Sequence, residues 1–119
     1  MKTLVVALLA GFLLVLPGSG AAHAKTCDLP AYPSASGRYV DGITAKHLSC
    51  DDAYKLMTKH YQCRIKNGPA GRCVKLVMHF GCREERFSDF YGGFFTSYVT
   101  CKHDRKTVKW AFEQSSTVA

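Results

Sequence analysis

Apart from one stretch near its N-terminus, this sequence contains no long run of apolar residues. Residues 4–16 are nearly all apolar, which is too short for a comfortable membrane-spanning helix. Lys2 precedes this run, and Ala22-His23-Ala24 provides the small-x-small pattern that a signal peptidase recognises. We predict a signal peptide over residues 1–24, cleavage near Ala24, and a secreted, extracellular protein with no stable membrane insertion.

The sequence also lacks the closely spaced Cys and His pairs that bind zinc. Its six cysteines all follow the predicted cleavage site: Cys27, Cys50, Cys63, Cys73, Cys82 and Cys101. An even number in a short exported chain indicates disulfides, with none left over as a nucleophile. We therefore predict three disulfides, no metal site and no cofactor. We predict Cys63–Cys73, which brackets a short loop, as one pair, and Cys50–Cys101 and Cys27–Cys82 as the others.

Acidic residues are scarce. The chain has 9 Asp and Glu against 16 Lys and Arg. Removal of residues 1–24 takes away only one lysine, so the remaining 95 residues carry a formal charge of +6. Such a charge suits an anionic polymer or an envelope component as partner, although solubility alone explains it equally well. The sequence indicates no specific nucleic acid and no particular oligomeric state.

The stretch SCDDAYKLMTKHYQC predicts a helix over about residues 50–61. Ser49 is a good N-cap, and Asp51 and Asp52 suit the positive end of the helix dipole. The apolar residues recur at helical spacing in a stripe that includes His60. We expect His60 to be a partly buried structural residue. The two neighbouring aspartates point about 100° apart on a helix and make a poor acid/base pair.

The rest of the chain predicts a small sheet. Alternating patterns indicate strands over residues 74–82, about 94–102 and about 106–113. Proline and glycine indicate an irregular arm over 25–48, whose residues 43–48 form a short extended lead-in; 83–93 is a polar-aromatic loop and 114–119 a flexible tail. The predicted fold class is α+β, with one helix packed on a small antiparallel sheet of about three strands, stabilised by disulfides over residues 43–113.

Candidate binding residues lie in and beside the second predicted strand. Aromatic side chains next to glycines can stack on sugars or bases, and flanking cations can contact anions. The candidates are Tyr91, Phe94, Tyr98, Arg83, Lys102, Arg105 and Lys109. The competing interpretation, which we favour, is that Phe94, Phe95 and Tyr98 build the core, because a small domain needs its aromatic residues for burial.

Catalysis has one serious candidate. His79 and His103, with a nearby Lys or Arg, could supply the acid, the base and the cation for RNA cleavage. No motif links these histidines, so we name no catalytic residues. We predict an interaction or envelope-associated protein rather than an enzyme. The alternative is a small basic, ribonuclease-like hydrolase that acts on RNA or another anionic polymer.

Three motifs together resemble a group of small, secreted, cysteine-containing actinobacterial proteins. They are Ser49-Cys50 with Ala53, the run His79-Phe80-Gly81-Cys82, and Cys101 followed by Lys106, Val108 and Trp110. The resemblance implies export, disulfides and a helix-plus-hairpin fold. It implies no activity, because the group brings no catalytic residues that could be carried over.

Overall fold

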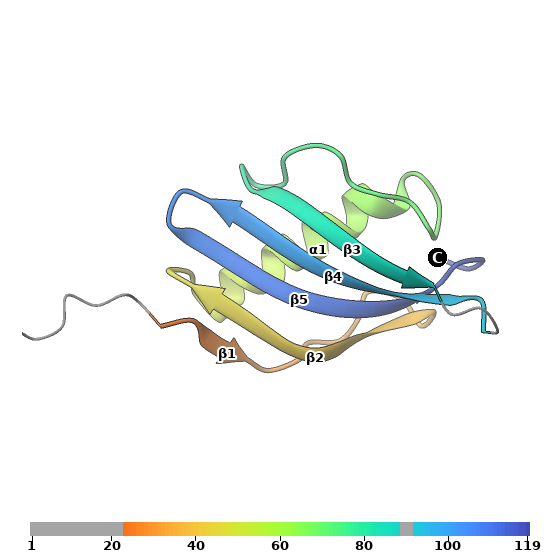
Figure 1. The fold of residues 1–119 in the computed structure, drawn as a ribbon, viewed down its shortest axis with the longest axis horizontal. Coiled ribbons are helices and arrows are strands. Elements are labelled where there is room, and N and C mark those ends of the chain that lie inside the picture. The colour runs from red at the N-terminus through yellow and green to blue at the C-terminus, as the bar shows by residue number, and fades with distance from the viewer. Residues whose placement is uncertain (1–22, 89–91) are drawn as a thin grey trace, which may run out of the picture.

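The computed structural model describes residues 23–88 and 92–119. The elements in chain order are β1 (Lys25–Cys27), β2 (Gly37–Lys46), α1 (Cys50–Ile65), β3 (Gly81–Ser88), β4 (Phe94–His103) and β5 (Lys106–Ser115). The strands form one antiparallel sheet in the order β1-β2-β5-β4-β3. The helix lies behind this sheet in Figure 1 and covers one of its two faces. The α+β class is confirmed, but the sheet has five strands rather than about three.

The helix begins where the sequence predicts and ends later. Ser49 caps it, and its side-chain oxygen accepts a hydrogen bond of 3.1 Å from the backbone N–H of Asp52. The buried stripe includes Leu56, Met57 and His60 as expected, and it continues to Arg64. Arg64, predicted to start a loop, is therefore a buried helical residue.

Three disulfides connect the elements. The predicted Cys63–Cys73 bridge is confirmed. The other two predicted pairs are wrong, because the bridges are Cys27–Cys50 and Cys82–Cys101. Cys82 and Cys101 lie directly opposite each other on β3 and β4, and β1 brings Cys27 to the start of the helix.

The predicted irregular arm contains two strands. Strand β2 pairs with β5 along most of its length, with an irregularity between Val40 and Thr44. Asp41 there has a φ of 61°, a left-handed conformation that Asp adopts more readily than most residues. Tyr39, Ile43 and Ala45 are buried. Glycine and proline in this region therefore mark a bulge and turns between strands.

The predicted first strand of the sheet, residues 74–82, is wrong. Val74, Leu76 and Met78, expected on its buried face, have exposed fractions of 92%, 66% and 44%. Only Val77 and Phe80 are buried, and they form an isolated bridge around a tight turn. Strand β3 includes only Gly81 and Cys82 of the predicted strand, and the rest of it lies where a loop was predicted.

The last two strands agree with the sequence. Phe95, Val99 and Cys101 of β4 are buried, as are Val108, Trp110 and Phe112 of β5. Strand β5 continues through Gln114 and Ser115, both buried, so the C-terminal tail is shorter than expected. No helix within residues 23–88 and 92–119 is long and apolar enough to cross a membrane.

Candidate functional site

The face of the sheet opposite α1 is covered by no helix or strand of residues 23–88 and 92–119 and is here called the open face (Figure 1). Strand register shows which side chains share it, because residues directly opposite each other point to the same side. Four cross-strand rows follow: Gly81, Lys102, Thr107 and Lys46; Arg83, Thr100, Lys109 and Thr44; Glu85, Tyr98, Ala111 and Val40; Phe87, Thr96, Glu113 and Arg38.

Four cations occupy the first two rows of the open face. They are Lys46, Arg83, Lys102 and Lys109, one from each of the strands β2, β3, β4 and β5. None of them forms an ion pair with another described residue. Arg38 in the fourth row differs, because its Nε lies 2.7 Å from a carboxylate oxygen of Glu113. The positive charge of the open face is therefore concentrated and unneutralised at the end near the β4–β5 turn.

Aromatic side chains lie beside these cations. Tyr98 is 46% exposed and Phe87 is 59% exposed, and their rings meet edge-to-face with centroids 5.9 Å apart. Phe94 is also exposed, whereas Phe95 is buried against Phe112. Our preference for assigning all three of Phe94, Phe95 and Tyr98 to the core is thus wrong for Phe94 and Tyr98. Side chains alternate between the two faces of the sheet along β4, so Phe94 and Tyr98 point to the open face.

The structure brings most of the predicted site residues together. Arg83, Tyr98, Lys102 and Lys109 line one hollow, which also includes Thr100 and Glu85. Phe94 borders a second hollow further along the face, with Arg38 and Glu113. Arg105 lies in the β4–β5 turn, and Tyr91 lies outside the described residues.

Two members of the open face were missed from the sequence. Lys46 belongs to a segment predicted as a lead-in, and pairing with Thr107 places it on this face. Phe87 belongs to a segment predicted as a loop. The signal that could have found it is the alternation of Arg83, Glu85 and Phe87 with Glu84 and Arg86.

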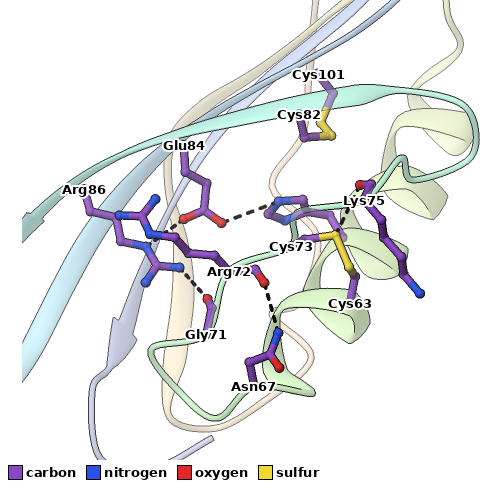
Figure 2. The surroundings of a disulfide bond; sticks show 11 residues. Cys63, Asn67, Gly71, Arg72, Cys73, Lys75, Cys82, Glu84, Arg86 and Cys101 are labelled. Atoms are coloured by element: carbon purple, nitrogen blue, oxygen red, sulfur yellow. Dashed lines mark hydrogen bonds and ion pairs between the residues drawn. A yellow bond between two sulfur atoms is a disulfide. The ribbon is translucent and has the colours of Figure 1, made fainter.

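A buried polar network lies on the covered face of β3. Glu84 Oε2 accepts hydrogen bonds from Arg86 Nε at 2.7 Å and from Ser97 Oγ at 2.9 Å. Arg86 also donates to the carbonyl oxygens of Ala70 and Gly71, both at 2.6 Å, and Figure 2 shows it between Glu84 and this loop. Arg86 is therefore a structural residue.

His60 packs against this network. Its Nε2 lies 3.5 Å from Oε1 of Glu84, and that oxygen has no hydrogen-bond partner among the described residues. Burial lowers the pKa of His60 to about 4, although the charge of Glu84 acts in the opposite direction. His60 is therefore neutral at pH 7, which agrees with its predicted structural role.

A second buried network ties both ends of the chain to the helix. Arg64 donates to the carbonyl oxygen of Pro69 at 2.6 Å and to the hydroxyl of Tyr32 at 3.0 Å, and its guanidinium lies 4.6 Å from the ring centre of Phe112. Burial raises the pKa of Tyr32 to about 12. Tyr32 in turn donates to Oε1 of Gln114 at 2.7 Å. These polar groups hold the fold together and are closed to a ligand.

Two other histidines approach each other. The ring centroids of His79 and His103 are 6.0 Å apart, and Lys106 lies directly opposite His103 in the β4–β5 ladder. His103 Nε2 is 3.5 Å from Asp104 Oδ2. Neither histidine lines the hollows of the open face described above.

Comparison of the chain with protein-family models, with curated proteins and with solved structures finds no match. Function is therefore inferred from the geometry of the two sheet faces and of the loops that connect the strands.

Proposed function

We propose that this protein is a secreted, disulfide-stabilised interaction protein that binds an anionic polymer, such as a component of the cell envelope, through its open face. Three disulfides support the extracellular part of the proposal, because disulfides persist in oxidising compartments. The N-terminal leader pattern supports it independently. The first described strand begins at Lys25, the first residue after the predicted cleavage site.

One observation carries the binding proposal. Lys46, Arg83, Lys102 and Lys109 come from four different strands, and register places them in two adjacent rows without a carboxylate partner among the described residues. Unneutralised cations on one face attract a polyanion and release its counterions on binding. Tyr98 at the centre of the face provides a flat surface for a sugar ring or another planar group.

The test uses retention of the oxidised protein on immobilised heparin as a model sulfated polymer. Lys102→Ser with Lys109→Ser removes two open-face cations, and Lys25→Ser with Lys55→Ser is the charge-matched control away from that face. Each cation that neutralises the polymer contributes about 0.7 to 0.9 to the slope of log K against log salt. We expect the first pair to reduce that slope by about 1.5 and the control to leave it nearly unchanged. Equal losses in both variants, or salt-insensitive retention, would contradict the proposal.

A second candidate function rests on the proximity of His79 and His103, whose ring centroids are 6.0 Å apart. General acid–base cleavage of RNA requires two such groups and a nearby cation, and Lys106 lies opposite His103. The test is incubation of the oxidised protein with RNA. Cleavage that disappears in both His79→Ala and His103→Ala would support a ribonuclease-like hydrolase. If cleavage persists in either variant, or if the unmodified protein cleaves no RNA, the ribonuclease-like function is contradicted.

A further inference from the structure

A second surface, distinct from the open face, lies where the chain leaves the Cys63–Cys73 disulfide. We call residues 74–80 the apolar finger. Val74, Leu76 and Met78 are exposed at 92%, 66% and 44%, which makes three large apolar side chains within five residues. Exposed apolar residues are common singly, but a contiguous group indicates a surface that something else covers.

The finger is a constrained element. The backbone groups of Val77 and Phe80 exchange two hydrogen bonds, at 3.0 and 2.8 Å, around the turn. Both of these side chains are buried and anchor the base of the finger. The turn holds Met78 and His79 at φ values of 49° and 69°, a left-handed conformation that is unfavourable for residues other than Gly, Asn and Asp.

Three lysines lie beside Leu76 and Met78. A shallow hollow is lined by Leu76, Met78 and Lys75 of the finger and by the helix residues Lys59, Gln62 and Cys63, with Lys66 at the end of the helix. Lys59, Cys63 and Lys66 follow helical spacing, so they form one stripe beside the finger. The Cys63–Cys73 disulfide fixes the finger to this stripe, with its two Cα atoms 5.2 Å apart (Figure 2). No carboxylate is among the residues that line the hollow.

We propose that the apolar finger and its lysines form a docking site for an anionic lipid surface. The chemistry of the surface favours this partner over another protein, because lysine is depleted at protein–protein interfaces. Apolar side chains at the tip of a loop can enter the boundary between headgroups and acyl chains, while lysine ammonium groups contact anionic headgroups. The contact is peripheral and involves a few side chains. It is also independent of the polymer-binding proposal, which uses other residues on the open face.

The test is flotation of the oxidised protein with phosphatidylglycerol–phosphatidylcholine vesicles and with phosphatidylcholine vesicles. We expect binding to the anionic vesicles only. Val74→Ser with Leu76→Ser should lower that binding by about tenfold or more, since two apolar side chains lose their place in the boundary. Both residues are exposed, so the folded state should survive. Leu29→Ser with Val118→Ser, which changes two exposed apolar residues elsewhere, is the matched control and should bind as the unmodified protein does.

The charge contribution is tested by Lys59→Ser and Lys75→Ser, each of which should lower the affinity by about fivefold. The finger variant, Val74→Ser with Leu76→Ser, should be retained on heparin as strongly as the unmodified protein. When Lys102 and Lys109 are already serine, replacing Val74 and Leu76 with serine should still lower vesicle binding. The proposal is overturned if the protein does not bind anionic vesicles, or if the finger variant and its control bind equally. It is also overturned if light scattering shows a dimer that the finger variant converts to a monomer, since a second copy would then cover the finger.

Discussion

The apolar finger, residues 74–80, exposes its apolar side chains to water, whereas the strand β3 that follows it buries two charged ones. The finger carries Val74, Leu76 and Met78, and these side chains face water. Strand β3 carries four charged residues in succession, Arg83 to Arg86, and two of them point into the interior. The side chain of Glu84 is only 6% exposed and that of Arg86 only 12%.

Hydrogen bonding explains why the charged segment is the one that joins the sheet. Glu84 receives hydrogen bonds from Arg86 and Ser97, and Arg86 reaches two loop carbonyls. A buried charge is tolerated when such partners are present. Strand β3 is also an edge of the sheet, where inward-pointing charges discourage pairing with another chain. Within the part of the chain that the structure describes, the side chains of Val74, Leu76 and Met78 have no such cover.

The largest expected effect comes from removing the buried carboxylate. Glu84→Ala leaves Arg86 without its carboxylate, and we expect a loss of about 3 kcal/mol in the free energy of unfolding. Glu85→Ala, one residue further on the same strand, changes the exposed face and should cost less than about 0.5 kcal/mol. Urea titration of both variants measures the difference. Similar values for the two would show that the interior network contributes little.

Acid should weaken the same network. The pKa of His60 is about 4 in the folded protein, against about 6.5 in an unfolded chain. The folded state therefore binds fewer protons, and the stability from this residue is complete above pH 6.5 and declines as the pH falls from 6.5 toward 4. Between pH 7.5 and 5.5 we expect a loss of about 1.4 kcal/mol in urea titrations. The control His79→Ala, which alters an exposed histidine, should show the same loss of stability between these pH values. If the stability of the unmodified protein did not change with pH, the burial of His60 as a neutral group would be contradicted.

The smallest effect concerns the finger itself. Met78 has a φ of 49°, so Met78→Gly relieves an unfavourable backbone conformation and should raise the free energy of unfolding by about 0.5 to 1 kcal/mol. The same change removes an apolar side chain from the proposed lipid contact and should lower vesicle binding. Opposite changes in stability and binding separate a binding role from a packing role. A destabilised variant would mean that Met78 contributes to the core.

Local patterns predicted part of this fold correctly. The N-cap at Ser49, the alternation in β4 and β5, and the short Cys63–Cys73 loop all depend on residues close in sequence. Prediction failed where neighbours across the sheet decide the outcome. The charges of β3 concealed its alternation, and the glycines of β2 suggested a loop. The apolar alternation of the finger indicated a strand that does not form.

The residues of the candidate site also divide into those that the sequence identified and those that it missed. The sequence identified three cations and one aromatic residue near one another in the chain: Arg83, Lys102, Lys109 and Tyr98. The structure places them around one hollow. Lys46 and Phe87 were not identified, because their membership of the open face depends on strands that the sequence did not predict.

Residues close together in the chain were enough to predict the helix, the last two strands, an even set of six cysteines and an excess of positive charge. These follow from periodicity, capping and composition, which act over a few residues at a time. The other two disulfides, the open face of the sheet and the apolar residues that remain in water became evident only in three dimensions. Those outcomes depend on strand register and on the partners available to each buried polar group, which are contacts between residues far apart in the chain.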